Sequence, residues 1–241
     1  PPRSTLFPYT TLFRSKESPV EAFLNIKEGE GMGTIIDITN DFPGNFDTNI
    51  QITEVKLKSN ATSYTGMIYD WSSHSMHGSY IDFPGHIKET DNGERADNFP
   101  HERLYRVPCS VIRLNRKSGS GAVSAQDLEK AFGGIPDTPA LLINALGKKD
   151  PDEVETRSVF LDDSALDWII ASGARMLVSD IYESQALHGV FLRLFEAGVS
   201  TVCEPRGLSR IKDNRVFLTV LFQKIPVVTQ IPCRLIVETM N

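Results

Sequence analysis

The sequence predicts an α/β fold, a single domain with a central mixed β-sheet flanked by helices. Residues 124–203 alternate helix and strand patterns, which favours parallel strands with helices packed on them. The preceding part of the chain is rich in strand patterns alone, which indicates that further strands extend this sheet. The chain has 241 residues, a length that fits one large domain, and no internal repeat or long flexible linker divides it.

Each helix in the second half is expected to begin at a polar residue and to end at a glycine, because such residues cap helix termini. Ser124 and Asp127 have the spacing of a capping box. The expected helices follow Ser124, follow Asp162 or Asp163, and cover residues 184–197.

The strands are expected from β-branched and apolar runs. Residues 140–145 are continuously apolar, which is typical of a strand buried on both faces. Residues 50–58 alternate apolar and polar side chains, which predicts a half-buried strand. The remaining strands are expected over residues 34–39, 66–71, 109–114, 175–180, 199–203, 215–223, 225–231 and 233–238.

Composition excludes several classes of function. The net charge is −6 and no dense basic stretch is present, which argues against a nucleic-acid surface. No apolar run approaches the ~20 residues that span a bilayer. The three cysteines lie far apart in apolar runs and are expected to be buried thiols, so a cytoplasmic location is expected.

Residues 1–15 are expected to be a non-native N-terminal artefact, and residues 16–241 to be the domain. This stretch lacks the basic start, apolar middle and small-residue cleavage site of a signal peptide. Residues 5–15 look like the translation of a sequencing-adapter oligonucleotide.

The chemistry is concentrated between Ser73 and His86, where three of the five histidines accompany Asp82. Histidine and aspartate are common metal ligands and general bases. In an extended strand, alternate side chains share one face. The residues that would share it are His74, Met76, Tyr80, Asp82 and His86.

The segment from Met76 to His86 resembles the signature His-x-Gly-Thr-His-x-Asp-x-Pro-x-His of the putative-cyclase family. Gly78, Asp82, Pro84 and His86 match this signature, and Ser79 replaces its threonine. Further similar segments are residues 35–39, 123–129, 173–180 and 197–204.

The resemblance covers roughly residues 33–239. It implies a kynurenine-formamidase-like fold of the swivelling β/β/α type, a homodimer, and hydrolysis of formamides or small cyclic amides and esters. The best-known family members are metal-dependent arylformamidases, which act in tryptophan catabolism.

Carried over by position, the resemblance implies that Asp82 and Glu204 bind a metal and that His86 is catalytic. Met76, Tyr80 and Leu192 stand where the family has ligand histidines. A thioether and an aliphatic side chain do not replace imidazole as ligands of zinc or manganese, so the metal is expected to be weakly bound or absent.

Three hypotheses follow for the site. In the first, His86, oriented by Asp82 or Glu204, activates water without a metal while Tyr80 donates a hydrogen bond to the developing oxyanion. In the second, His74 and His188 join the two carboxylates in a rebuilt metal site. In the third, the protein is catalytically inactive and binds a ligand or partner.

Ordinary structural roles are also open for these residues. His74 and His77 are individually typical of surface or structural histidines, and Asp82 could cap a turn beside Pro84. Glu204 could pair with Arg206 or Arg210. Trp71 could be a packing residue or could wall an aromatic pocket.

The sequence therefore predicts an arylformamidase-like hydrolase of non-peptide C–N bonds in a small, aromatic amide, lactam or formamide. Trp71 and Met76 are the expected substrate-binding residues, and the expected partners are a small-molecule substrate and a second copy of the chain. The alternative is an inactive homologue that binds a ligand or an interaction partner.

Overall fold

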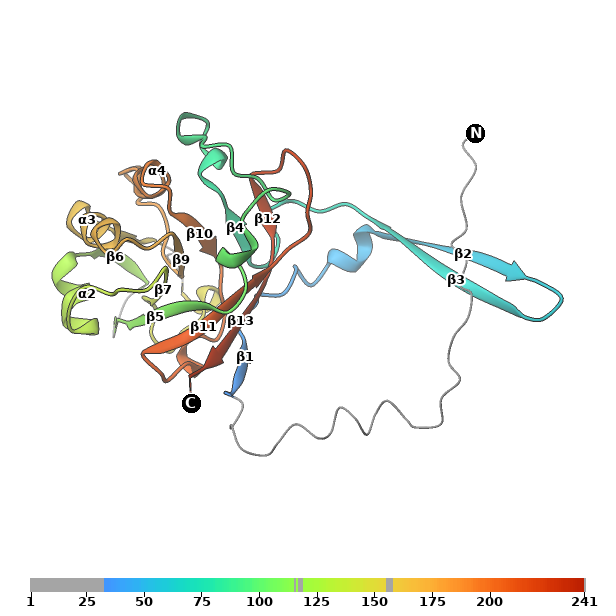
Figure 1. The fold of residues 1–241 in the computed structure, drawn as a ribbon, viewed down its shortest axis with the longest axis horizontal. Helices are drawn as coiled ribbons and strands as arrows, with labels where there is room; N and C mark the ends of the chain where they lie inside the picture. Colours follow the sequence, from blue (N-terminus) through green and yellow to red (C-terminus); the bar gives the residue numbers. More distant parts are fainter. Residues whose placement is uncertain (1–32, 115, 117–118, 155–157, 241) are drawn as a thin grey trace. The chain divides into compact units, whose positions relative to one another are not determined.

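A nine-stranded mixed sheet organises the computed structural model (Figure 1). The structure describes residues 33–240 except 115, 117, 118 and 155–157, so the expected artefact at residues 1–15 lies outside it. The strand order is β1-β13-β11-β5-β7-β9-β10-β4-β12. The strands are β1 (Ile35–Asp37), β4 (Tyr80–Asp82), β5 (Val107–Arg113), β7 (Ala140–Asn144), β9 (Met176–Ser179), β10 (Ser200–Cys203), β11 (Arg215–Leu221), β12 (Gln230–Pro232) and β13 (Arg234–Thr239).

The centre of this sheet is parallel and its outer strands are antiparallel. β5, β7, β9 and β10 run parallel to one another, whereas β11 and β4 pair antiparallel with the two ends of that group. The predicted mixed sheet is therefore confirmed.

The sheet curls until its two edges meet. β12 and β13 lie at or near opposite ends of the strand order, yet only Cys233 separates them along the chain. The segment after β1 also contacts the segment before β4, because the amide of Ser79 donates to the carbonyl of Asn40 at 3.4 Å. The carbonyl of Ser79 accepts from the Cys233 amide at 2.8 Å. This seam holds β4 beside residues that are distant in sequence.

The sheet separates two apolar cores, and β7 contributes to both. Leu142 belongs to the core on the concave side of the sheet, whereas Leu141 and Ile143 belong to the core under the helices. All of β7 is buried, as the continuous apolar run predicted. Successive strand residues point to opposite faces, so a strand covered on both sides has no position for an exposed polar residue.

Two helices follow their local capping signals. α2 (Ala125–Phe132) begins with the predicted capping box between Ser124 and Asp127 and ends at Gly133, whose φ is 93°. α3 (Asp163–Ala171) begins at Asp162, whose carboxylate accepts from the amide of Ala165 at 2.9 Å. Both helices cover the convex side of the sheet beside the small parallel sheet of β6 (Ser120–Val123) and β8 (Ser158–Leu161).

The third helix is shorter than predicted. α4 spans only Val190–Glu196, and Gly189 before it has a left-handed backbone with φ of 78°. The carboxylate of Glu183 accepts from the amide of Val190 at 2.8 Å. The Glu183 carboxylate therefore satisfies an amide at the start of α4, and residues 184–188 form a turn outside the helix.

β2 (Ile50–Lys58) and β3 (Ser63–Trp71) form a separate two-stranded hairpin. The predicted strand limits for β2 are confirmed, but its predicted half-burial is wrong, because both strands are largely exposed on both faces. Apolar and polar residues alternate along β2 as predicted, yet none of the described elements packs on either face of the hairpin.

Short 3-10 turns complete the described chain at Phe46–Asn49, Pro84–His86, Lys88–Thr90, His101–Arg103, Pro151–Glu153 and Leu208–Arg210. The three cysteines are buried free thiols, as predicted. Within the described ranges no helix has the length and apolar character that a membrane span requires.

Candidate functional site

β4 places the family motif inside the sheet. It lies between β10 and β12, so Asp82 is opposite Thr201 on one side and Gln230 on the other. Residues directly opposite one another in antiparallel strands point to the same face. Ile81 occupies the alternate face and packs in the concave core. The strand therefore holds Tyr80 and Asp82 on one face, as the alternation predicted. The other members of the predicted face, His74, Met76 and His86, lie outside this strand.

Asp82 is buried and hydrogen-bonded. The side-chain nitrogen of Gln230 donates to its carboxylate at 2.7 Å, and the Cys203 thiol contacts the other oxygen at 3.7 Å. Burial raises the pKa of Asp82 to about 6, while His86 and the Gln230 hydrogen bond oppose this rise. The carboxyl group is thus close to its titration point near neutral pH.

Gln230 connects Asp82 to two other polar groups. Its side-chain nitrogen lies 3.3 Å from Nε2 of His86, and its oxygen accepts from the hydroxyl of Ser75. A neutral His86 with its proton on Nδ1 accepts this hydrogen bond. Asp82, Gln230 and His86 therefore form one polar chain, which we call the Gln230 relay.

His86 lies at the outer end of the relay. It ends the 3-10 turn Pro84–His86, in which Pro84 occupies the first helical position. Its side chain is exposed and lines neither of the two cavities described below.

A cavity of about 470 Å³ contains the other end of the family motif. Met76, Tyr80 and Glu204 line it together with Arg206. Glu204 follows β10 with a left-handed φ of 55°, so the chain turns sharply where the strand ends. Asp82 does not line this cavity.

Tyr80 contributes a neutral phenol there. Burial raises the pKa of Tyr80 above its usual range, and the nearby Cys203, Asp82 and Glu204 add to this rise. The hydroxyl therefore stays protonated at neutral pH and can donate a hydrogen bond.

Gly78 is needed at the seam between the two segments that wall the cavities. Its φ is 68°, and an added Cβ would lie 2.8 Å from the carbonyl oxygen of Asn40. A side chain at this position would therefore force apart the segment after β1 and the segment before β4.

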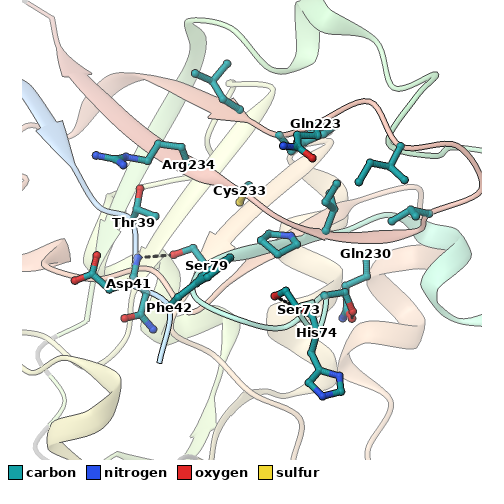
Figure 2. A pocket seen from close by; sticks show the side chains of 18 of the residues that line it. Thr39, Asp41, Phe42, Ser73, His74, Ser79, Gln223, Gln230, Cys233 and Arg234 are labelled. Carbon is teal, nitrogen blue, oxygen red and sulfur yellow. Dashed lines mark hydrogen bonds between the residues drawn. The ribbon is translucent and has the colours of Figure 1, made fainter. Parts of the chain in front are cut away.

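A larger cavity, of about 800 Å³, lies beside the first and shares residues Asn40–Phe42 with it. Aromatic side chains of Phe42, Phe46, Trp71 and Phe222 line it. Figure 2 shows the labelled polar side chains around this cavity, among them Thr39, Asp41, Ser73, His74, Gln223, Gln230 and Arg234.

The structure thus separates residues that the first hypothesis groups together. Tyr80 and Glu204 share the smaller cavity, whereas the buried Asp82 lines neither cavity and is hydrogen-bonded to Gln230, which lies beside His86. Gln230 and Ser75 were not identified from the sequence. A glutamine within the apolar run of residues 227–231 was the available signal for the first of them.

The substitute metal ligands are not brought to the two carboxylates. His188 precedes α4, and its ring packs on Phe160 with ring centroids 5.2 Å apart. His74 contacts His77 edge to face at 5.3 Å and lines the larger cavity, which neither carboxylate lines. The structure does not assemble the rebuilt site, because the turn at residues 184–188 replaces the helix that would have carried His188.

The family's histidine metal positions hold other side chains in this chain. Across the described ranges, no group of three or more His, Cys, Asp and Glu side chains is arranged to hold a metal ion. Met76 offers a thioether and Tyr80 a neutral phenol beside Glu204. Zinc and manganese bind imidazole and carboxylate ligands instead.

Solved structures share this fold at low sequence identity. Isatin hydrolase A from Labrenzia aggregata, bound to benzyl benzoate, has a TM-score of 0.66 and 16% identity over 93% of this chain and 100% of its own. Isatin hydrolase A from Ralstonia solanacearum has a TM-score of 0.63 and 13% identity over 94% of this chain and 99% of its own. A potential metal-dependent hydrolase with cyclase activity has a TM-score of 0.61 and 19% identity over 86% and 99%.

The fold and the motif therefore define an α/β protein of the cyclase type. The putative cyclase family model matches residues 7–185, most of the chain, and the chain belongs to this family. No curated protein matches the chain.

Proposed function

We propose that this protein is a ligand-binding member of the cyclase family that takes a small aromatic amide or lactam in the larger cavity and does not carry out metal-centred hydrolysis. The proposal rests on two features observed together. The chain has a cavity of about 800 Å³ with aromatic walls, and Met76 and Tyr80 stand where the family has metal-binding histidines. The first feature supports binding, and the second removes the ligands on which the family's metal depends.

The cavity suits a compact aromatic ligand. Small-molecule sites are concave, have volumes of ~300–1,000 Å³, and combine apolar walls with a few polar groups. Trp71 and Phe222 provide apolar surface, while Ser73 and Gln223 provide hydrogen-bonding groups for an amide. Three solved structures of the same fold are isatin hydrolases, which supports an aromatic lactam as the ligand class.

Metal-free hydrolysis is the second candidate, and the Gln230 relay favours it. Gln230 positions the exposed imidazole of His86 near the buried Asp82 carboxylate, and His86 can act as a general base once its Nε2 releases the hydrogen bond from Gln230. This candidate ranks second because His86 and Tyr80, its proposed base and oxyanion donor, do not line one cavity.

Calorimetric titration with isatin and with N-formylkynurenine tests the binding proposal. We expect binding of at least one compound, and Trp71→Ala should weaken it about tenfold through loss of aromatic contact. Tyr69→Ala is the matched control, because Tyr69 is an exposed aromatic residue of the same strand that does not line the cavity. No binding of either compound, or equal weakening by both substitutions, would contradict the proposal.

Hydrolysis of the same two compounds separates the candidates. We expect no turnover in chelator or with added zinc or manganese. Turnover that resists chelator and disappears in His86→Gln would establish the second candidate instead. Turnover that requires added metal would contradict both, because it would mean that Met76 and Tyr80 do not prevent metal binding.

A further inference from the structure

The larger cavity meets the Gln230 relay at two residues. Ser75 and Gln230 both line this cavity, and Gln230 is labelled in Figure 2. Gln230 lies directly opposite Asp82 across the β4–β12 pair, so both side chains are on one face of the sheet. A ligand in this cavity therefore meets the hydrogen-bonding groups that Ser75 and Gln230 leave unused.

The buried carboxylate of Asp82 fixes the orientation of the Gln230 side-chain amide. A carboxylate only accepts hydrogen bonds, so the amide nitrogen of Gln230 faces it, at 2.7 Å. The same nitrogen lies 3.3 Å from Nε2 of His86, which takes its second hydrogen. A flipped amide would place two buried acceptors against each other and leave both without a donor. Both amide hydrogens of Gln230 are therefore used inside the relay.

The amide oxygen of Gln230 in turn fixes the hydroxyl proton of Ser75. This oxygen is an acceptor, and the Ser75 hydroxyl donates to it. A serine hydroxyl has one proton and two lone pairs, so a Ser75 that donates to Gln230 can only accept from a further partner. Ser75 is half-buried on the cavity wall. Ser75 and Gln230 together therefore present oxygen lone pairs, and no polar hydrogen, to a ligand.

We propose that Ser75 is a specificity-determining residue that accepts a hydrogen bond from the N–H of a secondary aromatic amide or lactam bound in the larger cavity. This inference rests on the proposed binding function and narrows its ligand class to compounds that carry a donor beside the carbonyl. Gln223 lines the same cavity, and its side-chain amide can donate to the carbonyl of such a ligand. A lactone or ketone of the same shape lacks the donor that Ser75 requires.

Three ligands of one shape test this selectivity. Oxindole carries a lactam N–H, 2-indanone has a methylene group at that position, and 2-coumaranone has an oxygen there. In calorimetric titration of the full chain, oxindole should bind about fivefold more tightly than 2-indanone, which is the effect of one hydrogen bond. 2-Coumaranone should bind no more tightly than 2-indanone, because its ring oxygen would face the Ser75 oxygen with no proton between them.

Substitution of Ser75 assigns the selectivity to its hydroxyl. Ser75→Ala should weaken the binding of oxindole about fivefold and leave that of 2-indanone unchanged, so that the preference disappears. The unchanged binding of 2-indanone would also show that the cavity is intact in the variant. Ser72→Ala is the matched control, because Ser72 is an exposed serine of the same segment that lines neither of the two cavities. Both affinities should be the same in this control as in the wild type.

Four results would overturn the inference and leave the proposed function standing. The first is binding of oxindole or isatin with no preference for oxindole over 2-indanone, and the second is a preference that survives Ser75→Ala. Equal weakening of oxindole and 2-indanone by Ser75→Ala would show that Ser75 only packs against the ligand. Tighter binding of 2-coumaranone than of oxindole would show that the Ser75 hydroxyl donates to the ligand. Failure of both lactams, isatin and oxindole, to bind would instead reject the proposed function together with this inference.

Discussion

β7 and β2 are both apolar-rich strands, yet one is buried on both faces and the other is exposed on both. β7 has β5 and β9 as parallel neighbours and an apolar core on each side, so Leu142 is 0% exposed. Among the described residues β2 pairs only with β3, and Ile52 is 54% exposed. An apolar pattern therefore indicates a strand but does not say whether any other element covers it.

The largest loss of stability is expected when a core side chain of β7 is truncated. Leu142→Ala should lower the free energy of unfolding by about 2–5 kcal/mol, because it leaves a cavity in a close-packed interior. Urea denaturation followed by circular dichroism measures this change. A loss below about 1 kcal/mol would mean that β7 is less tightly covered than the structure shows.

A buried charge provides the next test. The pKa of Asp82 is raised from 3.8 to about 6, so the folded state binds its proton more tightly than the unfolded state does. Ionisation therefore destabilises the fold, with no effect below the unfolded pKa and the full effect above about 6. Asp82→Asn should stabilise the protein by up to about 3 kcal/mol near pH 8 and by little near pH 4.

Thermal unfolding across this pH range measures the difference, with Asp70→Asn on the exposed hairpin as its control. We expect that control to change the stability by less than about 0.5 kcal/mol at either pH. An Asp82→Asn effect that is equal at the two pH values would contradict the buried-charge explanation.

A smaller difference in stability is expected between variants of two serines whose hydroxyls accept hydrogen bonds from backbone amides. Ser124 caps α2, which packs on the nine-stranded sheet, and the hydroxyl of Ser59 accepts a hydrogen bond from the amide of Thr62 in the hairpin turn. Ser124→Ala should cost about 1 kcal/mol in global unfolding. Ser59→Ala should change global unfolding by less than half of that, because opening of the hairpin turn is local. Equal losses in urea denaturation would show that hairpin and sheet unfold as one unit.

The smallest effect is expected in the middle of the hairpin. Ile68 is 51% exposed, and at a concentration where the chain is monomeric Ile68→Ala should change the free energy of unfolding by less than about 0.5 kcal/mol. The same denaturation experiment used for Leu142→Ala measures it. A loss comparable to that of Leu142→Ala would mean that part of the same chain covers this face.

Local signals accounted for the elements that were predicted well. The capping box at Ser124 and the cap at Asp162 could be predicted from the sequence, because a capping residue and the amides it binds lie within a few residues of each other. The shared face of Tyr80 and Asp82 followed from strand alternation for the same reason. Residues 184–189 were predicted as part of a helix but lie outside it, because the backbone at Leu187 and at Gly189 has positive φ, which is incompatible with a right-handed helix.

The α/β class, the capped helices, the buried run of β7 and the family of the motif can all be predicted from the sequence. These depend on residues close together in the chain or on a motif of fixed spacing. The folded chain was needed to show that Gln230 links Asp82 to His86, that His188 packs on Phe160, and that no described element covers β2. Each of these depends on contacts between segments distant along the chain, and those contacts follow from how the sheet curls rather than from any local pattern.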